Sequence, residues 1–254
     1  MLPMADLETN IEISVNKSIS LLKQRRNYSI ITQCCLKRQK NYRRIHMKKI
    51  TDIFLRALLT GVAIAIGGTV YLSCPNKYLG AFLFGTGLFV ILTFGFNLFT
   101  GKVGYAVENK PSYLGELGII WLGNFAGAAL SALLINQTRI SAISDKAAEL
   151  CEIKLGDNIT SIFILAFFCG ILMFIAADGY KNNQNPVGQI LAIFLPVVVF
   201  ILSGFEHCIA NMYYFTLAGS WNTKAFGYLI IMSLGNAAGG ILIPLVRKGF
   251  VKRI

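Results

Sequence analysis

Long apolar stretches separated by short polar segments make up most of the chain beyond about residue 50. A helix needs about 20 apolar residues to cross the hydrocarbon core of a bilayer. Stretches of about that length or more lie near residues 53–73, 78–107, 113–136, 159–177, 188–218 and 226–246. This pattern predicts an all-α membrane protein with six transmembrane helices.

The second and fifth stretches are too long for one straight crossing. Each contains a Gly-Phe pair followed by polar residues, which read Gly95-Phe96-Asn97 and Gly204-Phe205-Glu206-His207. At membrane depth, non-helical backbone is tolerated only where it is buried in protein or lines a wet cavity. We therefore predict that helices two and five are both broken and that the two breaks border a pathway.

An internal repeat relates the two halves of the chain. Residues 58–61 (LLTG) are similar to 167–170 (FFCG), and 122–127 (LGNFAG) are similar to 234–239 (LGNAAG). Because each half holds an odd number of spans, the second half enters from the opposite side, which predicts two inverted three-helix repeats. Close helix packing is the role expected for the small residues of this repeat, Gly123, Gly127, Gly235 and Gly239.

Composition and charge support a membrane protein. The chain is 55% hydrophobic and only 14% charged, too few charged residues to cover a soluble fold of this length. Its formal net charge is +12, and the first 52 positions hold 11 basic residues against 4 acidic ones. A basic segment before a first span is typical of a cytoplasmic flank next to anionic lipid, a reading we prefer to nucleic-acid binding.

We therefore expect a basic cytoplasmic extension over residues 1–46 and a channel domain over 47–254. Both termini should face the cytoplasm of a protein in the plasma membrane. The aromatic residues Tyr213, Tyr214 and Trp221 are expected at headgroup level.

The cysteines indicate no cofactor, since no pair has zinc-ligand spacing. Buried thiols are the expected state. A disulfide between Cys74 and Cys151 is the alternative if both face outward.

Glu206 and His207 are the outstanding candidates for chemistry. An ionisable residue inside a span costs roughly 2.5 to 3.5 kcal/mol on insertion scales, so it is a functional candidate by default. A histidine can donate and recover a proton near neutral pH. The alternatives are a histidine that only bonds a neighbouring helix and a glutamate that ties down freed backbone N–H groups.

At these residues the chain resembles the formate/nitrite transporter family. Residues 204–213 (GFEHCIANMY) are similar to its fifth-helix signature and residues 98–101 (LFTG) to its second-helix loop signature. The resemblance covers roughly residues 48 to 246. It implies an aquaporin-like protomer, a homopentamer in the lipid bilayer, and one pathway per subunit for small monovalent anions and protons.

The resemblance also implies site residues. The central histidine and the loop threonine fall on His207 and Thr100, and a vestibule lysine falls on Lys154. Gly170 stands where the family has an asparagine, which suggests a changed inner gate. The outer constriction is expected at Phe84, Leu88 and Phe200, the inner one at Leu98, Phe99 and Met173, and the fifth-helix signature adds Glu206 and Asn211.

These residue types fit passage of a weak acid. Desolvating a bare anion has an idealised cost on the order of 20 kcal/mol, and still several after relaxation. Protonating a carboxylate with a pKa of about 3.9 at pH 7 costs roughly 4 kcal/mol. A neutral acid is therefore the cheaper passenger, with His207 as proton donor.

Two other classes of function are weighed. An aquaporin-like channel for small neutral solutes is the nearest rival, but the Asn-Pro-Ala triplets expected of one are absent from the sequence. An intramembrane hydrolase would need Cys208 and His207 to act together, and adjacent residues point in different directions. We therefore expect a channel or transporter, not an enzyme.

Overall fold

The computed structural model describes residues 47–251. The chain divides into two units after Lys49, and the second begins at Ile50. The expected basic extension, residues 1–46, lies outside the described residues.

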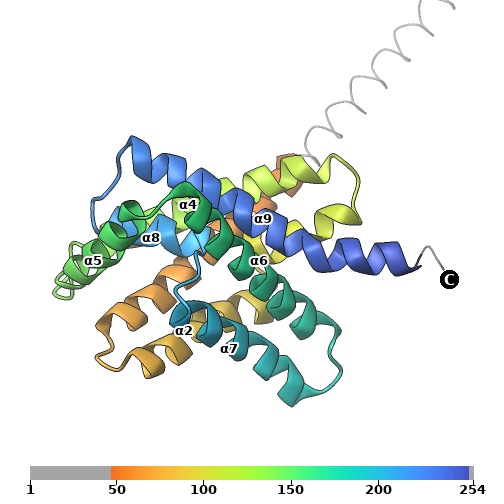
Figure 1. Cartoon of the computed structure of the whole chain (residues 1–254), viewed down its shortest axis with the longest axis horizontal. Coiled ribbons are helices and arrows are strands. Elements are labelled where there is room, and N and C mark those ends of the chain that lie inside the picture. The colour runs from red at the N-terminus through yellow and green to blue at the C-terminus, as the bar shows by residue number, and fades with distance from the viewer. Residues whose placement is uncertain (1–46, 252–254) are drawn as a thin grey trace, which may run out of the picture. The chain divides into compact units, whose positions relative to one another are not determined.

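The described part of the chain is helical throughout and contains no strand, which confirms the all-α prediction (Figure 1). The first helix is Met47–Ser73. It is followed by α2 (Lys77–Thr93), α3 (Phe99–Lys102), the 3-10 helix η1 (Val103–Val107), α4 (Tyr113–Ile135), α5 (Ile143–Gly156), α6 (Ile159–Asn182), α7 (Pro186–Leu202), α8 (Cys208–Leu217) and α9 (Thr223–Val251).

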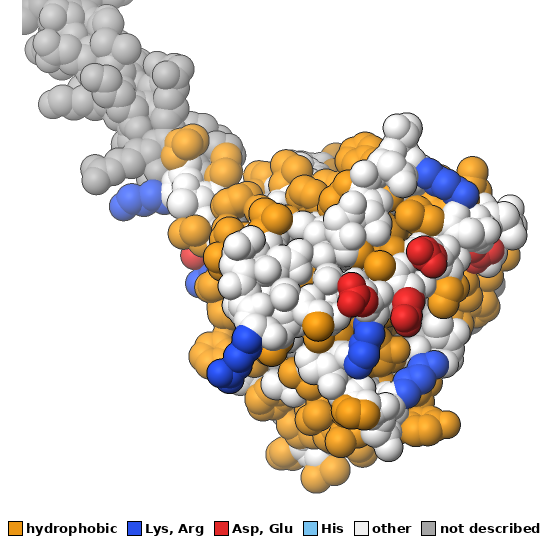
Figure 2. Space-filling view, turned by 90° about the vertical axis from the view of Figure 1, so that its left-hand side faces the viewer, with side chains coloured by type: hydrophobic (Ala, Val, Ile, Leu, Met, Phe, Trp, Pro, Cys, Tyr) orange, Lys and Arg blue, Asp and Glu red, His pale blue; other side chains and the backbone are white. Residues whose placement is uncertain are grey.

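Within the described residues, four helices are long and apolar enough to cross a membrane: the first helix, α4, α6 and α9. The apolar helices α2 and α7 have 17 residues each and are shorter than a full crossing. Each of these two ends where the sequence predicted a break. Hydrophobic side chains predominate over much of the face in Figure 2, as expected for a surface in contact with lipid or another subunit.

Helix α5 was not predicted, since residues 137–158 were expected to be a loop. Its buried residues Ile143, Ala147 and Cys151 recur every four positions, which places them on one helical face. Through that face α5 packs on α8. The periodic signal was present in the sequence, but it is short and lies among charged residues.

Glycines allow the closest approaches between helices. A Cβ at Gly127 would overlap the carbonyl oxygen of Leu58, and one at Gly239 would overlap that of Phe167. The two contacts are equivalent in the repeat, and they support the packing role expected for these glycines. Helix α6 packs extensively on α9, and α2 lies beside α7 (Figure 1).

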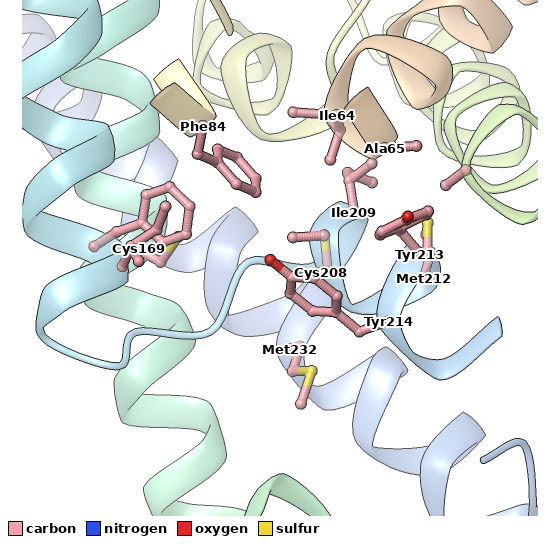
Figure 3. Packing of buried hydrophobic residues seen from close by; sticks show 14 of the residues in the cluster. Ile64, Ala65, Phe84, Cys169, Cys208, Ile209, Met212, Tyr213, Tyr214 and Met232 are labelled. Carbon is pink, nitrogen blue, oxygen red and sulfur yellow. The ribbon is translucent and has the colours of Figure 1, made fainter. Parts of the chain in front are cut away.

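The expectation for two of the three aromatic residues was wrong. Tyr213 and Tyr214 are buried in the interior with Ile209, Met212 and Met232 (Figure 3). The Tyr213 hydroxyl lies 2.6 Å from Thr69 Oγ1. Both side chains project from α8, a helix enclosed by α4, α5 and α9, so neither reaches a headgroup region.

Candidate functional site

The two non-helical segments have the same backbone geometry. Gly95 (φ 65°) and Gly204 (φ 69°) adopt left-handed conformations immediately after α2 and α7. The following N–H groups, of Phe96 and Phe205, donate to the carbonyls of Ile91 and Phe200 five residues earlier. This is the Schellman ending, in which glycine avoids the steric cost of a positive φ. The Gly-Phe pairs of the repeat therefore encode two matched helix ends.

A buried asparagine holds each segment in place. Asn124 on α4 donates to the carbonyls of Ala57 and Asn97, at 2.8 Å each, and accepts from the Phe99 N–H at 2.9 Å. The side chain thereby satisfies backbone groups on both sides of the first break, where lipid could not.

Asn236 on α9 makes the equivalent contacts at the second segment. It donates to the carbonyls of Ala166 (2.7 Å) and Glu206 (2.8 Å) and accepts from the Cys208 N–H (2.9 Å). The repeat around Asn124 and Asn236 predicted inverted halves and packing glycines, but no role was assigned to the two asparagines. The signal that could have identified them is an asparagine at the equivalent position in two apolar stretches of the sequence.

Thr100 and His207 meet between the two segments. Thr100 Oγ1 lies 2.9 Å from His207 Nε2, and both side chains are buried. His207 is also the N-cap of α8, where its Nδ1 accepts the Ala210 N–H at 3.1 Å. Because a backbone N–H can only donate, Nδ1 carries no proton and the neutral imidazole holds its proton on Nε2. That N–H points at the threonine hydroxyl.

Glu206 faces a lysine instead of free backbone N–H groups. Lys154 Nζ on α5 lies 2.7 and 2.9 Å from the two carboxylate oxygens, and Asn211 Nδ2 donates to one of them at 2.7 Å. The side chains of Lys154 and Glu206 are 14% and 4% exposed. The lysine expected in the vestibule is therefore ion-paired with Glu206. The ion pair fastens α5 to the residue before His207.

Two residues of the expected outer constriction form a chain of ring contacts that reaches His207. The Phe84 and Phe200 rings meet edge to face with centroids 5.6 Å apart, and the Phe200 ring lies 5.7 Å from the imidazole. Leu88 is buried in the same core. The structure thus brings the Phe84 and Phe200 rings next to the histidine.

Those of the expected inner constriction lie around α3. Leu98 and Met173 are buried in the same hydrophobic core, and Phe99 is half-buried against it. Beyond Leu98 a cavity of about 370 Å³ opens, lined among others by Gly101, Lys102 and Lys181. This cavity could not be predicted from sequence, because its lining comes from α2, α3, η1, α6 and α7.

The role expected for Gly170 is corrected by the structure. A Cβ at this position on α6 would overlap the backbone oxygen of Asn236 on α9, so no side chain fits there. The glycine is a packing residue equivalent to Gly61, which meets Asn124 in the same way. The interpretation of Gly170 as a lost gate amide therefore does not hold.

The described part of the chain has four free cysteines, Cys74, Cys151, Cys169 and Cys208. Cys74 and Cys151 are both free, so the disulfide alternative is wrong. Burial raises the pKa of the Cys151 thiol on α5 to about 11. It is therefore protonated at neutral pH and a poor nucleophile. Among the described residues, no group of His, Cys, Asp or Glu side chains could hold a metal ion.

Comparison with known proteins gives consistent matches. Residues 30–247 match the family model described as formate/nitrite transporter. The chain is 29% identical to the uncharacterized transporter YrhG of Bacillus subtilis over 180 residues, or 65% of this chain and 68% of that protein. It is 30% identical to the formate channel FocB of Escherichia coli over 182 residues, which is 64% of this chain and 64% of FocB.

Solved structures share the fold. A pentameric formate channel with formate bound superposes with a TM-score of 0.70 at 22% identity, covering 82% of this chain and 99% of that chain. An FNT family ion channel superposes with a TM-score of 0.66, also at 22% identity, covering 80% and 89%.

Proposed function

Because this chain belongs to the formate/nitrite transporter family, we propose that it carries small monovalent anions of weak acids, such as formate, nitrite or hydrosulfide, across the plasma membrane. The observation that carries the proposal is the buried hydrogen bond between Thr100 and His207. It places two buried polar groups, one from each half of the chain, next to the Phe200 ring.

The proposed architecture has six crossings arranged as two inverted repeats. Helix α2 with α3 and η1 forms one broken crossing, and α7 with α8 forms the other. The equivalent bonds of Asn124 and Asn236, which hold the two breaks, support this symmetry. A homopentamer with one pathway per subunit follows the pentameric structural relative. With both termini in the cytoplasm, the Leu98 end of the path faces inward and the Phe84 end outward.

The apolar side chains around His207 favour a protonated passenger. A bare anion among Phe84, Phe200 and Leu98 would lose several kcal/mol of hydration even after relaxation, against roughly 4 kcal/mol to protonate a carboxylate at pH 7. The anion is held at the centre by hydrogen bonds from Thr100 Oγ1 and His207 Nε2. There it receives a proton and continues as the neutral acid.

The cap bond of His207 sets a condition on proton transfer. Giving up the Nε2 proton from the neutral ring would leave an imidazolate, so a proton must first arrive at Nδ1. That step breaks the bond from the Ala210 N–H, worth about 0.5 to 2 kcal/mol for a helix cap, and puts a cation at the positive end of α8. After transfer the ring is neutral with its proton on Nδ1. It returns to the resting form when water supplies a proton to Nε2 and Nδ1 releases its own proton to water and accepts the cap bond again. The neutral ring is therefore the resting form.

The ion pair of Lys154 and Glu206 has a positioning role in this scheme. It holds the backbone next to His207 against α5 and adds no net charge to the path. An anion that approaches Lys154 competes with a carboxylate already bound to it.

The test is flux of formate, nitrite and hydrosulfide into liposomes at two pH values. We compare wild type with His207→Asn, which keeps a side chain able to cap α8 but cannot relay a proton. We expect flux to fall in the variant and to lose its pH dependence. Unchanged flux and pH dependence would discard the proton relay.

Thr100→Val is the matched variant on the other side of the bond, because valine keeps the shape and removes the hydroxyl. Water permeability is measured on the same liposomes. Water flux without anion flux in wild type would favour a channel for neutral solutes instead.

A further inference from the structure

The cavity beyond Leu98 has an unusual charge balance. Lys102 at the end of α3 and Lys181 near the end of α6 both line it, and no carboxylate among the described residues does. In the described part of the chain neither ammonium forms an ion pair. The Lys181 Nζ lies 5.0 Å from the centre of the Tyr105 ring, a cation–π contact that leaves the charge uncompensated.

The carboxylate next to this cavity already has other partners. Asp178 on α6 accepts from Arg247 Nη1 at 2.7 Å and from Asn182 Nδ2 at 2.8 Å, and the Tyr105 hydroxyl lies 3.4 Å away. Its charge is thus offset by Arg247 and is not available to neutralise the two lysines.

The two ends of the path therefore differ. At the Phe84 end, Lys154 is paired with Glu206. At the Leu98 end, two unpaired cations border about 370 Å³, which is room for an anion with roughly ten water molecules at about 30 Å³ each. An anion there keeps much of its hydration, unlike one at His207.

We propose that this cavity is a second, hydrated binding site for small carboxylates and oxyanions, formed by Lys102 and Lys181. The site rests on the proposed function for its place in the path, and it gives anions at the Leu98 end an electrostatic advantage that the Phe84 end lacks. A cavity with largely apolar walls and charge of one sign concentrates counter-ions. It therefore loads the path preferentially from that end.

The first test is formate uptake into membrane vesicles of both orientations, with initial rates measured over a range of formate concentrations. We expect Lys102→Gln and Lys181→Gln each to raise the half-saturation concentration about two- to fivefold from the Leu98 face only. Lys110→Gln removes an exposed lysine outside the cavity and serves as the control. Equal half-saturation concentrations in all three variants and wild type would overturn the proposal.

A second test does not depend on transport. Purified full-length protein is acetylated with an amine-reactive ester, with or without excess formate, and modified peptides are quantified by mass spectrometry. We expect formate to slow modification of Lys102 and Lys181 relative to Lys110. Absence of selective protection would overturn the site even if the channel conducts, whereas protection without flux would overturn the proposed function and leave the site.

Discussion

Replacing Asn236 by leucine tests whether the buried amides hold the helix breaks. The substitution keeps the side-chain size and removes three hydrogen bonds, to the carbonyls of Ala166 and Glu206 and from the N–H of Cys208. Hydrogen bonds inside membrane proteins are worth about 0.6 kcal/mol on average and about 1.7 at most. The three bonds together therefore contribute about 2 to 5 kcal/mol.

The assay is thermal unfolding of purified protein in detergent, followed by flux in liposomes. For a chain of this size 1 kcal/mol corresponds to about 2 to 4 °C, so we expect the unfolding temperature to fall by roughly 4 to 20 °C. Asn124→Leu should behave alike, because its three contacts are equivalent.

Asn109→Leu is the control, since Asn109 makes only one exposed side-chain bond, to the Tyr105 carbonyl. We expect its unfolding temperature to stay within a degree or two of wild type. If Asn236→Leu and Asn124→Leu unfold no earlier than this control, the reasoning about the breaks is refuted.

Three further predictions follow from contacts in the structure. Gly239→Ala should abolish folding or lower the yield sharply, because its Cβ would overlap a backbone oxygen. Gly115→Ala is the control and should express normally, because there is open space around Gly115. Equal yields of the two variants after detergent extraction would contradict this. Lys154→Met should destabilise the protein by about 3 to 5 kcal/mol, because it leaves the Glu206 carboxylate buried and unpaired. Adding Glu206→Gln should recover much of this loss when the unfolding temperatures of the two variants are compared. No recovery would show that the pair does not act as a unit. Cys151 should resist a maleimide at pH 8 in folded protein and react after denaturation, since burial raises its pKa to about 11; rapid labelling of its tryptic peptide in the folded state would show that α5 does not cover it.

The family and the helical class could be predicted from sequence, because both depend on short motifs and on the local spacing of apolar residues. The motifs around Thr100 and His207 led to the family that residues 30–247 match, and apolar runs led to a helical protein. The Gly-Phe pairs located both helix ends, since glycine is the residue that accepts a positive φ at such an ending.

The assignments that failed were those that depended on neighbours far along the chain. The orientation of Tyr213 is fixed by the helices around α8, and the role of Gly170 by the backbone of α9. Lys154 and Glu206 are 52 residues apart, and no local pattern pairs them. Covering helices and distant partners therefore decided burial and charge state at these positions.

The sequence by itself determined where the chain is apolar, where glycine lets each helix stop, and which polar residues lie inside the apolar runs, because these properties belong to single residues and their nearest neighbours. Only the tertiary structure decided which of those polar residues meet. Three features join segments from different helices: the Thr100–His207 hydrogen bond, the hydrogen bonds of Asn124 and Asn236, and the cavity lined by Lys102 and Lys181. Helix packing alone brings these segments together.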